Sequence, residues 1–302
     1  HTDFKKETEY QMSLHFILGA SGSGKSHTLY ETIITRSLAH PETTYLILVP
    51  EQFTMQTQKE LVDMHPSKGI LNIDVLSFQR LAYRVLDQLG VADRQILEET
   101  GKSLVLQKVA QENQRQLVYL GSQMKKQGYV QEIKSLISEF MQYGITIEQL
   151  DQMIQAVDGK KKITARKLQD IALLYDAFHR YLADNMIPAE EVLDVLCACI
   201  PRWEKIKNCE IVLDGFTGFT PVQNKLLDVL LGLCPQVWVT VTLGEEEDPH
   251  GKIAEHQLFA MSKKMIASLC RMARRQKIEI AEQWVMSGGQ GRFKDAPALD
   301  FL

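Results

Sequence analysis

Near its start the chain reads Gly19-Ala20-Ser21-Gly22-Ser23-Gly24-Lys25-Ser26, which matches the G-x-x-x-x-G-K-[ST] pattern of phosphate-binding loops. Residues 14–18 before it have the apolar character of a short buried strand, and residues 25–39 after it have the pattern of a helix. Glycines let backbone N–H groups turn toward phosphates, and the helix N-terminus adds a positive dipole end. The sequence therefore predicts ATP binding by this loop, with Lys25 at the β- and γ-phosphates and the Ser26 hydroxyl on Mg²⁺. The alternative is a glycine-rich turn that binds nothing.

Composition limits the classes of function. The 302 residues are 45% hydrophobic and 24% charged, which is typical of a globular chain with one large domain or two smaller ones. The net charge of −4 argues against non-specific coating of DNA, so any nucleic-acid contact needs a local patch. The five cysteines are sparse and form no C-x-x-C pair, which indicates reduced thiols in the cytoplasm without disulfides or a zinc site. No apolar run is long enough to span a membrane and no signal peptide is visible, so no membrane partner is expected.

The pattern around the loop predicts a parallel sheet. The run Thr44–Val49 is continuously apolar, as expected for a parallel strand buried on both faces. Alternation of such strands with helices is a βαβ progression with right-handed crossovers. Further strands are expected at 71–76, 209–214 and 236–242, and helices at 51–64, 78–89, 221–233 and 255–277.

Between these segments the character changes to helical. Apolar residues at i, i+3, i+4 and i+7 spacing predict packed helices at 100–113, 130–143, 147–157, 164–185 and 189–199. The predicted fold class is therefore α/β, a P-loop NTPase (RecA-like) parallel sheet with a large all-helical insertion. The predicted domains are 12–91 with 205–280 for the sheet and 92–204 for the insertion. Residues 1–11 are interpreted as a processed or engineered leader, and 281–302 as a linker toward a missing C-terminal part.

A second element of the nucleotide site is expected at Asp214. It follows the buried run Ile211–Leu213, and P-loop proteins place an acid at such a strand end to help hold Mg²⁺. Many ATPases have Glu next, where it polarises the attacking water, but this chain has Gly215, which has no side chain for acid–base work. No catalytic residue is assigned, and we expect weak hydrolysis of ATP or none.

Three further stretches resemble motifs of UvrD-like superfamily-1 helicases. Leu48–Phe53 lies where those proteins contact single-stranded DNA, and Val75–Leu86 resembles their T-x-H-S-F-x-x-R-x-L segment. Asp214–Gln223 resembles their D-E-F-Q-D-x-x-x-x-Q segment with the Glu missing. Together with the loop, these stretches are most similar to the N-terminal region of the AddB family, the second subunits of bacterial ATP-dependent helicase/deoxyribonucleases, over about residues 12–277.

The resemblance implies a subunit of a heterodimer that unwinds and degrades double-strand DNA ends for recombinational repair. It implies ATP and Mg²⁺ as cofactors, an A subunit as the active motor, and single- and double-stranded DNA ends as partners. AddB proteins also have a C-terminal nuclease domain with an iron–sulfur cluster. No nuclease signature and no four-cysteine set is present in this sequence, so this chain is expected to lack that activity.

Candidate DNA contacts follow from the same stretches. They are Pro50, Gln52, Phe53, Ser77, Phe78 and Arg80. The two phenylalanines are candidates for stacking on bases, because aromatic stacking drives single-strand binding. Possible phosphate contacts are Lys125-Lys126, Lys160-Lys161-Lys162 with Arg166-Lys167, and Arg271 with Arg274-Arg275, although each could equally be a solvated face. Two other functions stay open, a stand-alone P-loop kinase or nucleotide-dependent switch, and a scaffold whose P-loop is vestigial.

Overall fold

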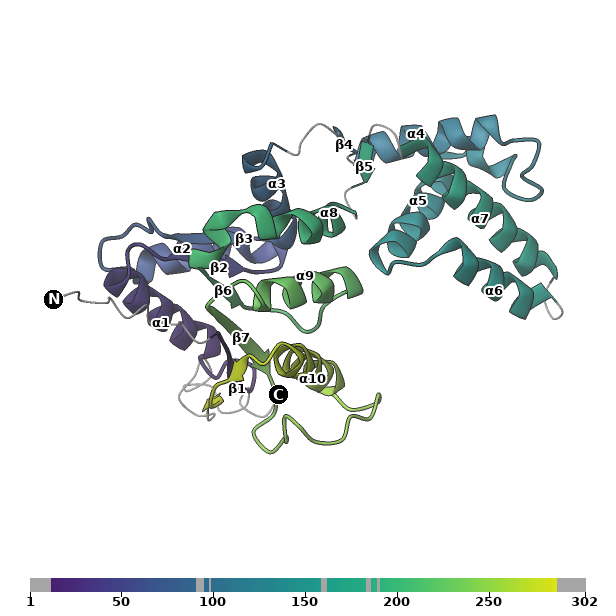
Figure 1. Ribbon diagram of the computed structural model, residues 1–302. Coiled ribbons are helices and arrows are strands. Elements are labelled where there is room, and N and C mark those ends of the chain that lie inside the picture. Colours follow the sequence, from purple (N-terminus) through teal and green to yellow (C-terminus); the bar gives the residue numbers. More distant parts are fainter. Residues whose placement is uncertain are drawn as a thin grey trace. The chain divides into compact units, whose positions relative to one another are not determined.

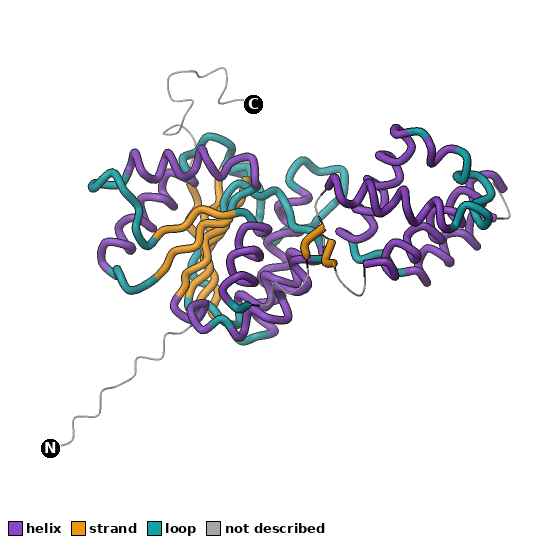
Figure 2. Tube along the Cα trace, turned by 90° about the horizontal axis from the view of Figure 1, so that it is seen from above, coloured by secondary structure: helices purple, strands orange, loops and turns teal. Residues whose placement is uncertain are grey.

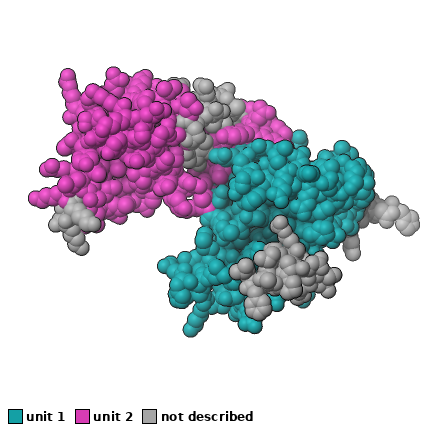
Figure 3. All heavy atoms as spheres, turned by 180° about the vertical axis from the view of Figure 1, so that it is seen from behind, with its two compact units in different colours: residues 1–81, 197–219, 223–302 teal, residues 82–196, 220–222 magenta. Residues whose placement is uncertain are grey.

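A computed structural model describes residues 12–90, 95–97, 99–158, 162–182, 186–188 and 191–286. The chain divides into two compact units, which Figure 3 distinguishes by colour. Unit 1 comprises residues 1–81, 197–219 and 223–302, and unit 2 comprises residues 82–196 and 220–222. The boundaries between the two units lie up to ten residues before the predicted domain boundaries at 91 and 204. The reason is that the helices Phe78–Gln88 and Val192–Cys199 each begin in one unit and end in the other.

Unit 1 is built on a seven-stranded sheet in which every described pairing is parallel (Figure 1). The strand order is β3-β2-β6-β7-β1-β8, and β9 also pairs with β1. The strands are β1 (Ser13–Gly19), β2 (Thr44–Leu48), β3 (Ile73–Leu76), β6 (Cys209–Leu213), β7 (Gln236–Thr242), β8 (Glu279–Ile280) and β9 (Trp284–Met286). The predicted α/β fold class with a parallel sheet is confirmed.

Helices lie on both sides of this sheet (Figure 2). The helices that lie wholly in unit 1 are α1 (Lys25–Ala39), α2 (Thr54–Met64) and α10 (Ala260–Arg275). Helices α3 (Phe78–Gln88), α8 (Val192–Cys199) and α9 (Pro221–Leu231) each belong partly to unit 1, which also contains 3-10 turns at Glu51–Phe53, Ile200–Arg202 and Glu204–Asn208. Helix α1 is held against the sheet by one apolar face, on which Leu29 and Ile33 belong to the same buried cluster as Ile17, Ile47 and Val212. Burial of that face positions the helix N-terminus directly after β1.

The C-terminal part of unit 1 differs from the prediction. Strands β8 and β9 extend the sheet to Met286, so residues 284–286 belong to the sheet although the linker was predicted to begin at 281. Helix α10 begins at Ala260 instead of 255. Strands of two and three residues are too short to show an alternating pattern, and Trp284 and Val285 of β9 are exposed. The predicted leader at 1–11 and the remainder of the predicted linker, 287–302, lie outside the described residues.

Unit 2 is mainly helical, as predicted. It contains α4 (Glu99–Glu112), a 3-10 turn at Gln123–Lys125, α5 (Gln127–Gln142), α6 (Ile147–Asp158) and α7 (Lys162–Leu182). Its core includes Leu106, Val109, Ile137, Leu174 and Phe178. Among the described helices, none is both long and apolar enough to cross a membrane.

The insertion is not entirely helical. Strands β4 (Gln95–Leu97) and β5 (Met186–Pro188) form a short parallel pair, in which Gln95 lies opposite Met186. This corrects the prediction of an all-helical insertion. Each strand has only three residues, and the pairing joins positions about ninety residues apart, so no local pattern indicated it.

Candidate nucleotide-binding site

The predicted phosphate-binding loop connects β1 to α1. Gly22 has φ 78° and Gly24 has φ 89°, in the left-handed region that glycine adopts without strain. A Cβ at Gly19 would lie 2.6 Å from the Ser23 hydroxyl oxygen and 2.9 Å from the Met286 carbonyl oxygen, so the backbone approach requires glycine there. A Cβ at Gly24 would meet nothing within 4 Å, which leaves room beside the start of α1.

Lys25 is folded back onto the loop. Its side chain is buried, with 9% of the residue exposed, and its Nζ donates a 2.6 Å hydrogen bond to the carbonyl of Ala20. Burial lowers the pKa of this ammonium, and the negative charge of Asp214 partly opposes that shift. The lysine is therefore held at the loop, and it can exchange a neutral carbonyl partner for an anionic phosphate.

Asp214 follows β6 immediately and is buried. Its Oδ1 accepts hydrogen bonds from the hydroxyls of Ser26 at 2.9 Å and Thr240 at 2.5 Å. Its Oδ2 accepts one from Tyr30 at 2.6 Å. The predicted pair of magnesium ligands, Ser26 and Asp214, is thus in direct contact although 188 positions separate them.

Two members of this hydroxyl network, Tyr30 and Thr240, were not predicted. Tyr30 lies on α1 one turn beyond Ser26, and the pattern indicates only a core residue there. Thr240 lies on β7, which reaches Asp214 because β7 is placed between β6 and β1 in the sheet. Burial and the neighbouring Asp214 charge raise the pKa of the Tyr30 phenol well above its ordinary value, so this hydroxyl is a permanent donor. No signal in the sequence identifies either contact.

The residues fit a nucleotide phosphate with Mg²⁺. The Ser23 hydroxyl oxygen is buried in the loop and has no hydrogen-bond partner among the described residues. The first turn of α1 has no acidic residue, and no described side chain caps its N-terminus. Backbone donors and the helix dipole are thus left for an anion. Ser26 and Asp214 provide the hydroxyl and carboxylate oxygens that Mg²⁺ prefers.

Gly215 adopts φ +76°, again in the left-handed region. A Cβ there would lie 3.6 Å from Pro50 Cδ and 3.9 Å from Phe53 Cδ2, which is ordinary contact distance. The turn therefore has space for a side chain, but its backbone disfavours one. The glycine at the position where a Glu was expected is thus favoured by the backbone conformation of this turn.

We expect Gly215→Glu to lower the free energy of unfolding by about 1–2 kcal/mol, because an L-residue is strained in this conformation. We also expect it to leave ATP turnover within about twofold of the original chain. Denaturant unfolding and a phosphate-release assay measure the two effects. Gly218→Ala is the matched control, since Gly218 is not left-handed and a Cβ there meets only Met261 Cε at 3.4 Å. A gain in turnover of tenfold or more would contradict this prediction.

The candidate DNA contacts divide into an exposed and a buried group. Gln52 and Arg80 are exposed and Phe53 is 43% exposed, while Pro50 is half-buried. Arg80 Nε forms an ion pair with Glu51 at 2.9 Å. These residues surround the start of α2 and α3, beside the Gly215 turn.

Ser77 and Phe78 are in the buried group. The Ser77 hydroxyl accepts a hydrogen bond from the Arg80 backbone N–H at 3.3 Å, the geometry of an N-cap of α3. Phe78 is only 4% exposed, and its ring lies 5.4 Å from that of Phe216 and 6.1 Å from that of Phe219. Its faces are used in packing, so the prediction that Phe78 stacks on a base does not fit this conformation.

The predicted phosphate contacts at Lys160 and Lys161 lie outside the described residues. Of the predicted cluster at the end of α10, Arg275 pairs with Asp228. All five cysteines are among the described residues, are buried and form no disulfide.

Comparisons with known proteins place this geometry in context. A family model described as ADDB, N-terminal, matches residues 16–302. A protein of Lachnoclostridium phytofermentans, named as the B subunit of an ATP-dependent helicase/deoxyribonuclease, is 47% identical over 295 residues, which cover 96% of this chain and 26% of that protein. Proteins of the same name from Caldanaerobacter subterraneus subsp. tengcongensis and Clostridium acetobutylicum are 35% and 32% identical, over 96% of this chain and 25% of each protein. The chain thus spans about a quarter of the length of these curated relatives.

Proposed function

The chain belongs to the AddB N-terminal family, as its motifs indicated, and on this basis we propose that it is the ATP-binding, DNA-contacting first part of an AddB-type helicase/deoxyribonuclease subunit. The whole AddB protein would pair with an A subunit and process double-strand DNA ends for recombinational repair in the cytoplasm. The observation that carries the proposal is the contact of Ser26 with Asp214 next to the buried Lys25, which assembles a phosphate and Mg²⁺ site from distant segments.

In the proposed site each residue has a distinct role. Backbone N–H groups of the loop and of the first turn of α1 hold the phosphates, and Lys25 neutralises their charge. Ser26 and Asp214 hold Mg²⁺, which when bound screens the phosphate oxygens. Tyr30 and Thr240 orient the Asp214 carboxylate. Because Gly215 offers no base, the site binds ATP and hydrolyses it weakly or not at all.

The DNA-contacting surface is proposed to consist of Gln52, Phe53 and Arg80, with Pro50 shaping the turn. Phe53 has an exposed ring for stacking, and Arg80 is exposed beside it on α3. Ser77 and Phe78 stabilise the start of α3, next to this surface. Ser77 caps the helix, and Phe78 packs against Phe216 and Phe219. The same surface borders the Gly215 turn that follows Asp214, so the proposed nucleotide and DNA sites share one segment.

We expect Phe53→Ala to weaken binding of a fluorescein-labelled oligo-dT by about tenfold, because one base–aromatic stack contributes about 1–3 kcal/mol. Fluorescence anisotropy at several salt concentrations measures the affinity. Met55→Ala is the matched control, since Met55 is an exposed apolar residue of the neighbouring α2 and has no proposed contact. Equal affinities for the two variants would contradict stacking by Phe53, and no binding by the original chain would remove the DNA-contacting part of the proposal.

A further inference from the structure

Strand β9 packs onto the first residue of the phosphate-binding loop. It pairs in parallel with the end of β1, and in this register Met286 lies opposite Gly19 (Figure 1, where β9 belongs to the yellow C-terminal part). A Cβ on Gly19 would lie 2.9 Å from the Met286 carbonyl oxygen and 3.0 Å from Met286 Cβ. The last described strand of the chain therefore lies directly beside the proposed nucleotide site.

The Ser23 hydroxyl lies beside the same atoms. Its oxygen would be 2.6 Å from that Cβ on Gly19, so it converges with the Met286 carbonyl on one point next to the Gly19 backbone. Ser23 is only 7% exposed, and its hydroxyl oxygen has no hydrogen-bond partner among the described residues. A buried hydroxyl without a partner has a free-energy cost that a bound phosphate oxygen can remove. The position of β9 thus bears on a group that is poised to bind phosphate.

Gly19 is held between two strands of unequal strength. On one side the Leu243 N–H, at the end of β7, donates a 2.9 Å hydrogen bond to the Gly19 carbonyl oxygen. Strand β7 is firmly held, because it pairs with β1 over the whole length of β1 and also pairs with β6. Strand β9, on the other side, has three residues and pairs with β1 alone among the described strands. The weaker support of the loop is therefore β9.

Two side chains hold β9 in place. Trp284 and Met286 share one face of the strand, because successive side chains of a strand alternate. The Trp284 ring packs edge-on against buried Trp238 at 5.5 Å between centroids, and Met286 packs against the buried cluster that includes Leu29 of α1. Val285, between them, is 67% exposed. A segment with so few buried apolar contacts opens at low free energy, so its pairing can respond to a ligand.

We propose that β9 is a positioning element of the phosphate-binding loop and that Met286 is its positioning residue. Paired with β1, β9 holds the Gly19 backbone and the Ser23 hydroxyl in the arrangement that binds a triphosphate. Released from β1, it leaves the loop without this support, and affinity falls. The inference rests on the proposed function, since it concerns the same ATP site. By thermodynamic linkage, bound Mg-ATP stabilises the pairing of β9 with β1 by the same factor.

The test compares two ligands on the whole 302-residue chain. Isothermal titration calorimetry with Mg-ATP and with Mg-tripolyphosphate gives both affinities. We expect Met286→Ala to weaken both by about 3- to 10-fold, a usual range for a residue that acts through another. Met286→Leu keeps the apolar volume and is expected to bind within about twofold of the original chain. Tripolyphosphate has no base or sugar, so a loss confined to Mg-ATP would overturn the positioning of the phosphate loop.

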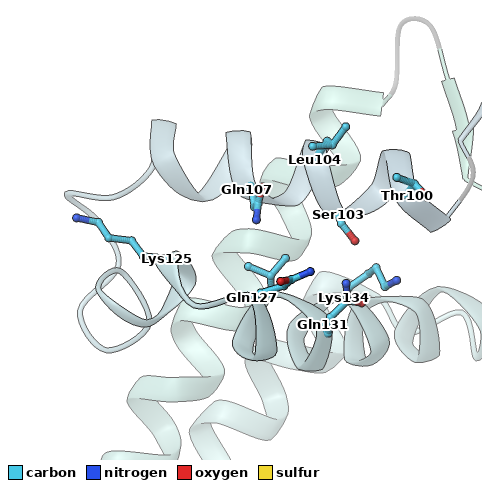
Figure 4. Close-up of a pocket in the computed structure, with 9 residues that line it drawn as sticks. Thr100, Ser103, Leu104, Gln107, Lys125, Gln127, Gln131 and Lys134 are labelled. Atoms are coloured by element: carbon cyan, nitrogen blue, oxygen red, sulfur yellow. The ribbon is translucent and has the colours of Figure 1, made fainter.

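Two control variants are matched to this change. Val285→Thr alters the exposed residue of the same strand and keeps a β-branched side chain. Gln131→Ala alters unit 2, where Gln131 lines the groove between α4 and α5 (Figure 4). Both are expected to leave the two affinities within about twofold of the original values, because neither side chain holds β9 against β1.

Trp284→Ala tests the strand without changing a residue that contacts the loop. Trp284 lies opposite Ile17 in the register, two residues before Gly19. Its removal takes away the second side chain that holds β9, and we expect both ligands to bind about threefold more weakly. This variant keeps the proposal testable if Met286→Ala does not fold, which urea unfolding of each variant establishes.

A double-mutant cycle separates positioning from a general structural role. Ser23→Ala alone is expected to weaken Mg-ATP binding by about tenfold, because it removes a hydrogen bond to a charged group. If Met286 acts through Ser23, adding Met286→Ala to Ser23→Ala causes little further loss, whereas independent effects multiply. Hydrogen exchange at the Val285 and Met286 amides is expected to slow when Mg-ATP binds.

The outcomes distinguish this inference from the proposed function. If Lys25→Ala weakens Mg-ATP binding but Met286→Ala and Trp284→Ala bind like Val285→Thr, the positioning role of β9 is overturned and the ATP site stands. Multiplying losses in the double-mutant cycle would overturn the action of Met286 through Ser23. If the original chain binds neither Mg-ATP nor Mg-tripolyphosphate, both the ATP site and the role of β9 are overturned.

Discussion

Asp214→Ala is expected to lower the free energy of unfolding of unit 1 by about 2–4 kcal/mol. The substitution leaves the buried Thr240 hydroxyl without its acceptor and leaves the Tyr30 hydroxyl with only the long 3.5 Å bond to Thr57, and an unsatisfied buried group costs about 1–3 kcal/mol. Lys25 also loses the negative charge that offsets its burial. Removal of the carboxylate also removes the free-energy cost of burying its charge, and this offsets part of the lost stability. The net effect is nevertheless large for a single site.

Urea unfolding followed by tryptophan fluorescence is the appropriate measurement. The chain has three tryptophans, Trp203, Trp238 and Trp284, and all belong to unit 1, so the signal reports that unit without a contribution from the helical one. Asp214→Asn keeps an acceptor oxygen and is expected to lose about half as much stability. Tyr30→Phe removes the described donor to Oδ2 while the hydroxyls of Ser26 and Thr240 still donate to Oδ1, and it is expected to cost about 1–3 kcal/mol. If Asp214→Ala unfolds at the same urea concentration as the original chain, the hydroxyl network has no structural role.

Lys25→Ala is expected to weaken binding of Mg-ATP by about 10- to 100-fold. A hydrogen bond to a charged group contributes about 1.5–3 kcal/mol, and each 1.4 kcal/mol is a factor of about ten in affinity. The fold itself is expected to tolerate the change, since the described partner of the Lys25 ammonium is the Ala20 carbonyl of its own loop and the ammonium is buried at a cost. Isothermal titration calorimetry with Mg-ATP gives the affinity, and the rise in melting temperature at saturating Mg-ATP gives an independent estimate.

Lys59→Ala is the control for general loss of a positive charge, because Lys59 lies exposed on α2. Equal binding of Mg-ATP by Lys25→Ala and the original chain would show that nucleotide is held elsewhere. Binding by neither chain would favour the scaffold with a vestigial loop, in which the Asp214 network keeps only its structural role. A stand-alone kinase or switch would instead show turnover or an acceptor-dependent loss of ATP.

The arrangement around Asp214 explains why one segment matters to both proposed sites. Asp214 is fixed by three hydroxyls, and the next residue, Gly215, makes a left-handed turn beside Pro50 and Phe53. Any displacement of the carboxylate on binding Mg²⁺ would act on this turn. The exposed ring of Phe53 is therefore separated from the proposed nucleotide site by the Gly215 turn alone.

Much of the fold followed from local patterns. The loop from Gly19 to Ser26, its flanking strand and helix, and the buried strands ending at Leu48 and Leu213 are contiguous in the chain, and their apolar periodicity is strong. The proximity of Ser26 and Asp214 was also predictable, because the acid at a strand end and the serine of the loop each belong to a recognisable pattern. Strands β4, β5, β8 and β9 were missed because two or three residues cannot show a period.

The sequence alone was thus sufficient for the α/β class and for the glycine-rich loop between β1 and α1, since each depends on residues adjacent in the chain. Only the tertiary structure could bring Tyr30 and Thr240 to Asp214, across 184 and 26 positions. Those contacts depend on the strand order, which inserts β7 between β6 and β1. The structure also placed Phe78 in the interior and Phe53 at the surface, because the packing of neighbouring segments decides which of two similar aromatic rings is covered.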